Sequence, residues 1–569
     1  MFEHAKEVTV TGGSITEIHG DSHTYGRPVT IVNGPRSLTE KQGLQILQKH
    51  VAAGAMHNSK ERYDAPKCHP DTRKAVVKDI TSWASDDSKD TLILWISAPA
   101  GSGKSAILQT IAELFHASGG LAASFFFSRT GPQRQTETHL IATIAAQLAI
   151  SIPSTRPFIE QVVLDDLSIF DKRLRVQMDL LVIQPLIRAS LQTGCSTPWP
   201  SLFIIDGLDE CIGSKVQANI LNILNHALLQ LKTSLPKLCL LIASRPEPAI
   251  CDVFEDKLSN ITHHLVLDNS YDPDRDIATF LRSSFAHIYH RRHTRFPSMS
   301  SLILPWPSED VISFLVKKSS GQFIFAATVI RFIDEDRKLP TSQLQVILDI
   351  CESLDASQHK TNPFALVDQL YAHVLRSSEE IHKVISLLGA IFYLEHNQNP
   401  TPAFLESLLG LNLDETILLF WDLHSIVYIP ASRTESIHFY HASFGDYLMD
   451  RHRSKDLHID EHVAHSLLLK SSMRQLSKMP LAEWQVVDDP AMQYSTKSWP
   501  HHYSRGNSIM AGTMDSFLQT FRLNSDLLNY STTSIKLVYW WEIYGRVQIN
   551  WHHEVSMHIQ KLHHNMLQI

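Results

Sequence analysis

A Gly-Lys-Ser tripeptide at residues 103–105 closes a short turn, and lysine followed by serine in this setting can bind a polyphosphate. Residues 92–96 before the turn are apolar, and a segment with helical apolar periodicity follows it. Backbone N–H groups at a helix start point toward a bound phosphate, the Lys104 ammonium adds positive charge, and the Ser105 hydroxyl can coordinate Mg²⁺. We therefore predict a phosphate-binding loop with nucleotide contacts from Ala98, Pro99, Ala100, Gly101, Ser102, Gly103, Lys104, Ser105 and Ala106.

One position of this loop departs from the strict G-x-x-x-x-G-K-[ST] pattern, because Ala98 stands where the first glycine is usual. That position begins the turn and need not adopt a positive φ, whereas Gly101 and Gly103 lie where the backbone must approach phosphate closely. An ordinary strand-to-helix turn is the alternative interpretation. The strand pattern before the loop and the helix pattern after it favour phosphate binding.

A second apolar run, at residues 202–205, ends in acidic residues. A continuous apolar run is typical of a parallel strand covered on both faces, and Asp206 at its carboxyl end would hold Mg²⁺ together with Ser105. Asp209 and Glu210 could orient or deprotonate an attacking water. The alternative is a buried strand followed by a solvated acidic turn.

A third apolar run, at residues 238–243, leads to Ser244 and Arg245. The strand beside the acidic one places such residues near a γ-phosphate, so Arg245 is a candidate sensor that distinguishes tri- from diphosphate. Asp209, Glu210 and Arg245 are thus the predicted catalytic set. Alternatively, Arg245 only caps the strand before Pro246 ends it.

The three motifs together resemble NACHT domains, the nucleotide switch of STAND-class signalling ATPases (signal transduction ATPases with numerous domains). The resemblance is to the fungal branch, also described as nephrocystin-like N-terminal domains, and spans most of residues 36–455. It implies an α/β P-loop NTPase domain with a mainly parallel sheet, followed by helical and winged-helix domains. It also implies ATP/ADP and Mg²⁺ as cofactors and slow hydrolysis of ATP rather than GTP. Further matches lie at residues 58–62, 68–73, 124–129, 143–149 and 177–185.

Two further sites are implied by the resemblance alone. In the family, the stretch before the loop contributes to base binding, which corresponds to Thr72 and Arg73; a helix cap with a surface arginine is the alternative. Relatives also place a histidine that reaches the diphosphate at the position of His441, where an imidazole can donate to a phosphate oxygen. A histidine hydrogen-bonded within its own domain is the alternative there. Phe323 occupies the place where related switches pack a proline on adenine, so base recognition stays open.

Length and composition agree with a multidomain cytoplasmic protein. A chain of 569 residues exceeds what one core sustains, and its formal charge of 51 minus 59, or −8, argues against a dedicated nucleic-acid binder. The six cysteines are widely spaced, as expected for reduced structural thiols in the cytoplasm. No apolar stretch is long enough to span a bilayer, and no signal-peptide pattern opens the chain.

The pattern along the chain predicts six regions. They are a β-prone or flexible extension at 1–35, a helical segment at 36–90, the nucleotide domain at 91–250, a helical domain at 251–364, a winged-helix domain at 365–455 and a helical region at 456–569. Residues 8–18 alternate around a Gly-Gly pair and predict a small hairpin or a weakly ordered tail, with a short amyloid-forming signal as the alternative.

The C-terminal region contains no internal repeat but several histidine pairs, at residues 501–502, 552–553 and 563–564. Histidine pairs raise the question of a metal site. His558 comes one residue too late after His553 for the zincin spacing, so we expect no metal to be bound there.

The resemblance implies a signalling switch. ADP would be clamped between the loop and the winged helix, and exchange for ATP with Mg²⁺ would expose a surface for self-association and for a downstream effector protein. Fungal innate immunity or non-self recognition is the biological setting implied by the family. A static nucleotide-binding scaffold without turnover and an AAA+-type remodelling ATPase are the alternatives.

Overall fold

The structure is a computed structural model that describes residues 40–506, apart from 63–64, 130, 132, 193–198, 236, 354–363, 396–397, 431, 477 and 479–488. The hairpin predicted at residues 8–18 and the histidine pairs at 552–553 and 563–564 lie outside the described residues.

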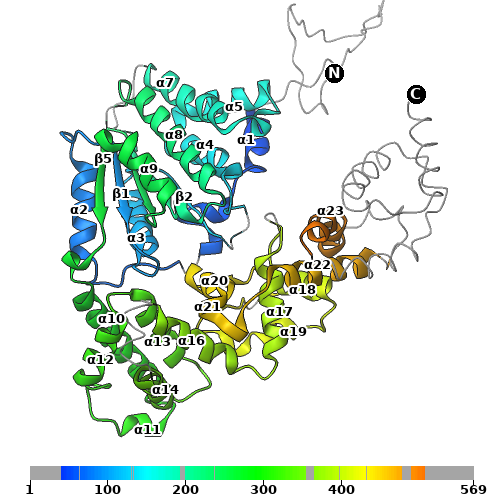
Figure 1. Ribbon diagram of the computed structural model, residues 1–569. Coiled ribbons are helices and arrows are strands. Elements are labelled where there is room, and N and C mark those ends of the chain that lie inside the picture. Colours follow the sequence, from blue (N-terminus) through cyan, green and yellow to red (C-terminus); the bar gives the residue numbers. More distant parts are fainter. Residues whose placement is uncertain are drawn as a thin grey trace, which may run out of the picture. The chain divides into compact units, whose positions relative to one another are not determined.

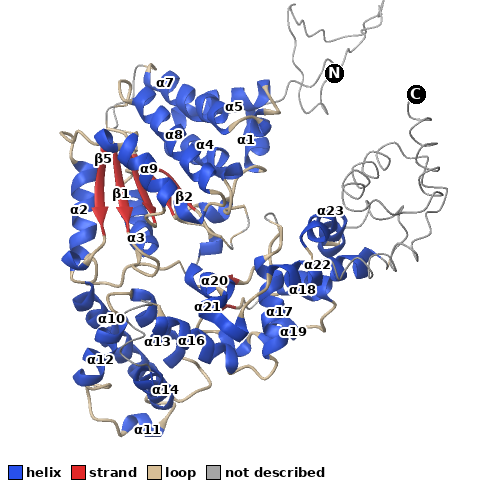
Figure 2. Ribbon diagram, viewed as in Figure 1, coloured by secondary structure: helices blue, strands red, loops and turns tan. Residues whose placement is uncertain are grey.

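A five-stranded parallel sheet forms the centre of the α/β region (Figures 1 and 2), which confirms the predicted fold class. Its order, β2-β3-β4-β1-β5, makes β3, β4 and β1 consecutive neighbours, so their carboxyl ends meet at one edge. These three strands carry the acidic motif, the arginine motif and the loop. The strands are β1 (Ile93–Ser97), β2 (Leu121–Phe126), β3 (Leu202–Asp206), β4 (Cys239–Ser244) and β5 (Thr262–Val266).

Alternate residues of each strand enter different cores, because successive side chains of a strand point to opposite faces. In β1, Ile93 and Trp95 belong to one hydrophobic core, and Leu94 and Ile96 belong to the other. Both faces are therefore covered, and the strand reads as a continuous apolar run rather than an alternating one.

Strand β5 extends the sheet beyond the predicted end of the nucleotide domain at residue 250. It pairs in parallel with β1 over Thr262–Val266, at the edge of the sheet. Its two central histidines, His263 and His264, are exposed, so the strand lacks the apolar run that marks a covered strand. The predicted boundary falls before the last strand because an edge strand with polar residues gives no such signal.

Helices cover both faces of the sheet (Figure 2). Side chains of α2 and α3 fill the core on one face, and side chains of α4, α8 and α9 contribute to the core on the other. The helices of this region are α1 (Glu40–Gln48), α2 (Lys74–Ser85), α3 (Lys104–Ala117), α4 (Leu140–Ser151), α5 (Arg156–Asp165), α6 (Leu174–Gln177), α7 (Gln184–Ser190), α8 (Ser214–Leu231) and α9 (Pro248–Asp256), with a π-helical turn at Met178–Ile183.

The part after β5 is mainly helical, and buried apolar side chains from Ile277 to Tyr494 form one continuous core. Residues 365–455, the predicted winged-helix domain, contain α16 to α21 and a two-stranded antiparallel sheet of β6 (Val427–Tyr428) and β7 (His438–Phe439). The helices are α10 (Pro273–Arg292), α11 (Pro297–Ser300), α12 (Glu309–Ser319), α13 (Phe323–Ile333), α14 (Pro340–Ser353), α16 (Ala365–Arg376), α17 (Ile381–Phe392), α18 (Pro402–Leu409), α19 (Glu415–Leu419), α20 (Ala442–Met449), α21 (Arg451–Ser454), α22 (Glu461–Leu476) and α23 (Pro490–Arg505).

Two expectations from composition can be compared with the described residues. None of the helices in this part of the chain combines the length and apolar character that crossing a bilayer requires. The cysteines in it, Cys68, Cys211, Cys239, Cys251 and Cys351, all carry free thiols.

Candidate nucleotide-binding site

The predicted phosphate-binding loop connects the end of β1 to the start of α3. Gly101 has a φ of +78° and Gly103 a φ of +92°, conformations that side chains other than glycine rarely adopt. Gly101 is also tightly packed, since a Cβ there would lie 2.4 Å from Cγ2 of Ile324. The Ile324 amide donates to the Gly101 carbonyl oxygen at 3.2 Å, so the start of α13 packs directly against the loop.

Lys104 turns back into the loop. Its Nζ donates to the carbonyl oxygens of Ala98 at 2.7 Å and Pro99 at 3.0 Å. Burial lowers the pKa of Lys104, and the carboxylates of Asp209 and Asp206 oppose that shift. The ammonium therefore lies beside the loop backbone and within the field of the acidic residues that follow β3.

Asp206 and Ser105 form the candidate magnesium site. Asp206 ends β3 and is only 3% exposed, and burial raises its pKa to about 6, although a hydrogen bond with the Ser105 hydroxyl opposes the shift. Among the described residues, Oδ1 of Asp206 has no hydrogen-bond partner. A carboxylate oxygen and a hydroxyl are hard oxygen donors of the kind that Mg²⁺ prefers, so these side chains fit the ion.

The two acidic residues after β3 differ in their surroundings. Burial, reinforced by Asp209 and Asp206, raises the pKa of Glu210 to about 7, and its carboxylate accepts the Arg129 amide at 3.2 Å. A carboxyl that titrates near neutrality is suited to general-base catalysis. Asp209 is instead held by Arg245, whose amide donates to Oδ1 at 2.9 Å and whose Nε lies 3.1 Å from Oδ2.

Arg245 also binds a carboxylate from a distant part of the chain. Its Nη2 lies 2.7 Å from Oδ2 of Asp446 in α20, and Nη1 of Arg129 lies 3.1 Å from Oδ1 of the same residue. We call Asp209, Arg245, Asp446 and Arg129 the arginine–aspartate cluster. The cluster ties the carboxyl end of β4 to α20, the helix that follows His441.

His441 caps α20 and faces the same charges. Its Nδ1 accepts the Ser443 amide at 3.0 Å and contacts the Ser443 hydroxyl at 2.7 Å. Because Nδ1 is an acceptor, the proton of the neutral ring resides on Nε2. Burial, together with the positive charges of Arg245 and Lys104, lowers the pKa of His441 to about 3. The residue is therefore a neutral Nε2–H donor within the electrostatic reach of the loop lysine.

Thr72 and Arg73 lie beside the loop but make internal contacts. The Thr72 hydroxyl donates to the His69 carbonyl oxygen at 2.7 Å. Arg73 is 5% exposed, donates to the Ser102 carbonyl oxygen at 2.9 Å and lies 4.7 Å from the ring centre of Phe323. The hydrogen bond from Arg73 to Ser102 braces the loop backbone, and the predicted role of both residues in base binding stays a prediction.

Several charged residues of the site had no predicted role. They include Arg129 and Asp446 of the cluster, and Arg62, whose guanidinium lies 3.9 Å from the ring centre of Phe126. Burial lowers the pKa of Arg62 to about 10, while Asp206 and Glu210 oppose the shift. The matched stretches at 58–62 and 124–129 and the segment around His441 contain these residues, but only the tertiary structure brings them to the strand ends.

A cleft of about 560 Å³ opens beside the loop, within the size range typical of small-molecule sites. Four arginines and several residues of α20 and the turn after it line the cleft. The lining residues are Ala100, Arg129, Arg245, Phe364, Ser443, Asp446, Met449, Asp450, Arg451 and Arg453. The four arginines outnumber the two aspartates of the lining, Asp446 and Asp450, so the lining carries a net positive charge that favours an anionic ligand, although Arg129 and Arg245 are paired with Asp446 and Arg453 with Asp368.

Comparison with known proteins identifies one segment of the chain. Residues 72–245, from the turn before α2 to Arg245, match the family described as Nephrocystin 3, N-terminal. No curated protein matches the chain. Among solved structures, a STAND protein with a tetratricopeptide repeat sensor from Pyrococcus horikoshii aligns with 79% of this chain and 49% of its own length, at 11% identity and a TM-score of 0.39. The aligned part is thus about half of that archaeal protein.

Proposed function

We propose that this chain is a STAND-type signalling switch that binds ATP or ADP with Mg²⁺ and hydrolyses ATP slowly. The observation that carries the proposal is the position of Arg245, which contacts Asp209 beside the phosphate-binding loop and Asp446 in α20. One guanidinium thereby connects the candidate nucleotide site to the region predicted to move.

The loop supplies the groups for a polyphosphate. Its backbone N–H groups and Lys104 would hold phosphate oxygens, and α3 begins at Lys104 with its N-terminus toward the loop. Ser105 and Asp206 would hold Mg²⁺, which when bound neutralises phosphate charge. Glu210 would orient or deprotonate the attacking water, which its raised pKa allows near neutral pH.

Competition for Arg245 provides the switch. A γ-phosphate at the tip of β4 and the Asp446 carboxylate would be alternative partners of the same guanidinium, so ATP would weaken the link to α20. His441 would donate from Nε2 to a diphosphate oxygen in the closed form alone. A ligand shifts a conformational equilibrium only by its differential affinity for the two forms, and these two contacts would provide that difference.

The proposal includes what release of α20 would achieve. The opened protein would self-associate and engage a downstream effector protein, in a setting of fungal immunity or non-self recognition. Slow hydrolysis follows from the design, because a signalling state has to persist longer than a catalytic cycle.

The test is the nucleotide content of the purified full chain by mass spectrometry, together with its exchange and turnover rates. We expect about one ADP per chain with slow exchange, and its loss in Lys104→Ala, because the ammonium is a direct phosphate ligand. Lys317→Ala, a change at an exposed lysine of α12, is the matched control and should retain the nucleotide.

Three outcomes would contradict the proposal. Wild-type nucleotide content in Lys104→Ala would rule out the assigned site. Permanently bound nucleotide that never exchanges would indicate a static scaffold. Rapid hydrolysis in a ring assembly would indicate a remodelling ATPase.

A further inference from the structure

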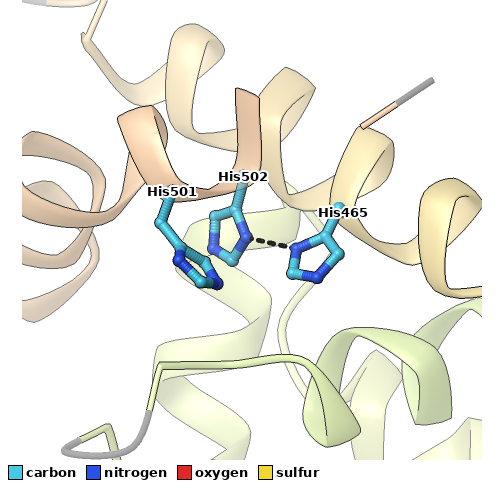
Figure 3. A group of neighbouring side chains, drawn as sticks. All are labelled: His465, His501 and His502. Carbon is cyan, nitrogen blue, oxygen red and sulfur yellow. Dashed lines mark hydrogen bonds between the residues drawn. The ribbon is translucent and has the colours of Figure 1, made fainter. Parts of the chain in front are cut away.

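Three histidines converge between α22 and α23 (Figure 3), and none of them is among the residues of the candidate nucleotide site. His465 lies in α22, and His501 and His502 lie in the last turns of α23; nitrogen atoms of all three are within 4.8 Å of one another. His465 is 3% exposed and His502 is fully buried, whereas His501 is exposed. We infer that these residues form a binding site for one zinc ion.

The two buried rings are already close to the spacing that an ion requires. Nδ1 of His465 and Nδ1 of His502 are 2.8 Å apart and joined by a hydrogen bond, drawn as the dashed line in Figure 3. Two nitrogens bound tetrahedrally to one zinc ion lie about 3.3 Å apart. Separation of the rings by roughly half an ångström would admit the ion. The proton of the donating Nδ1 would be released, and Nε2 of that ring would take up a proton from solvent, so that both Nδ1 atoms present a lone pair to zinc.

The other ring nitrogen of His502 is hydrogen-bonded to an oxygen atom, and that of His465 has a carboxylate nearby, beyond hydrogen-bond distance. Nε2 of His502 lies 2.6 Å from the Tyr494 hydroxyl, and Nε2 of His465 lies 3.8 Å from a carboxylate oxygen of Glu461. Metal-binding histidines commonly donate their other N–H to such oxygens, which orients the ring and fixes the tautomer. In the zinc-bound form both Nδ1 atoms would thereby be free to coordinate, whereas without the ion one of them carries the proton of the hydrogen bond between the rings.

The third ligand provides access. His501 is exposed, so its side chain is less constrained by packing than the two buried rings that it contacts. Three imidazoles suit zinc and leave a fourth position for water.

Zincin spacing places both histidine ligands on one helix, and the consecutive histidines at 501–502 do not have that spacing. The structure adds His465 from a second helix, 36 residues before His501 in the sequence. An ion here would join α22 to α23 and would stabilise their packing, because only the folded pair presents all three nitrogens.

The experiment uses the full chain without a polyhistidine tag. A chromophoric chelator competes for zinc in excess Mg²⁺, and the wild type is compared with His501→Ala and with His452→Ala, a change at an exposed histidine of α21. We expect one tightly held zinc per chain in the wild type and in His452→Ala. His501→Ala should bind that ion at least about ten-fold more weakly.

Thermal unfolding provides an independent measurement. Zinc should raise the unfolding temperature of the wild type and of His452→Ala but not that of His501→Ala, and cobalt in its place should produce visible absorption bands that the last variant lacks. Equal zinc affinity in all three proteins, or no tight ion in the wild type, would overturn the assignment and leave a tyrosine–histidine–histidine hydrogen-bond chain. Because His501 is exposed, its replacement should leave the fold intact and the comparison valid.

Discussion

Arg245 holds the arginine–aspartate cluster together. Its side chain and that of Asp446 are 22% and 17% exposed, so their ion pair is screened less by water than a fully exposed pair. Loss of one partner from a partly buried pair leaves the other charge poorly compensated. In the proposed switch this imbalance arises whenever a phosphate draws Arg245 away from α20.

Replacement of Asp446 tests this coupling. Asp446→Asn removes the carboxylate while retaining the side-chain size, and should accelerate exchange of bound ADP for ATP roughly ten-fold, a typical allosteric coupling. The exchange rate is measured from the release of a fluorescent ADP analogue. Asp456→Asn is the matched control, because Asp456 forms an exposed ion pair with Arg376 and should leave the rate unchanged. Equal rates in the wild type and Asp446→Asn would refute the coupling.

His441 can be altered without loss of its capping role. In His441→Asn the amide oxygen can accept the Ser443 amide as Nδ1 does, since asparagine is a good helix cap, but no donor reaches outward as Nε2–H does. A hydrogen bond to a charged group is worth about 1.5–3 kcal/mol, so ADP should dissociate at least about ten-fold faster. Stopped-flow release measures the rate. An unchanged ADP dissociation rate in a folded variant would show that His441 does not bind the nucleotide.

At the scale of elements, the loop after β1 and the start of α13 form one packed unit. Gly101 contacts Ile324 through backbone and side chain, and Arg73 donates to the loop and packs on Phe323. The helical region is therefore in direct contact with the candidate phosphate site. Changes in loop conformation would be transmitted to α13 without any intermediate element.

Substitution of two glycines separates backbone strain from this packing. Gly119→Ala introduces a side chain at a φ of +73° with nothing within 4 Å, and should cost about 1–2 kcal/mol. Gly101→Ala has the same backbone cost and a clash with Ile324, so overpacking should add about 1–3 kcal/mol. Urea unfolding of the two variants measures the difference. An equal decrease in unfolding free energy in both variants would show that α13 is not packed tightly against the loop.

At the scale of the whole molecule, buried histidines make the fold sensitive to acid. Burial, helped by the nearby His116, lowers the pKa of His57 to about 4, and His441 is lowered to about 3. Each is neutral when folded and would bind a proton more readily when unfolded. Their contribution to stability is fully present above pH 6.5 and is lost as the pH falls toward these lowered values.

His57 allows this contribution to be measured. A shift from 6.5 to about 4 corresponds to an upper limit of about 3 kcal/mol. In His57→Asn the amide oxygen can replace Nδ1 beside the Ser124 hydroxyl, while the titrating group is gone. The decrease in unfolding free energy between pH 7 and pH 4 should therefore be smaller by up to that amount, as measured by urea unfolding at each pH. In the control His452→Asn, at an exposed position, the unfolding free energy should depend on pH as in the wild type. The same pH dependence in His57→Asn would show that His57 does not contribute to the acid sensitivity.

Local sequence was sufficient to predict the main features of the α/β region. Lys104, Ser105, Asp206 and Arg245 were predicted as site residues because buried parallel strands are continuous apolar runs and these residues come at or shortly after the ends of such runs, and this assignment stays a prediction. The parallel sheet is confirmed, and its order β2-β3-β4-β1-β5 places the three motif strands side by side. Strand β5 was not predicted, because His263 and His264 interrupt its apolar pattern at the edge of the sheet.

Contacts between residues far apart in the chain could be recognised only from the tertiary structure. Asp446 lies 201 residues from Arg245 in sequence, and His465 lies 37 from His502. No local pattern reports such pairs, since nothing in helical or strand periodicity specifies which helix face meets which strand end. The sequence by itself thus determined the candidate phosphate-binding loop and the acidic residues proposed to act with it. Only the packing of the helical region determined that Asp446 pairs with Arg245 and that the rings of His465 and His502 are hydrogen-bonded to each other.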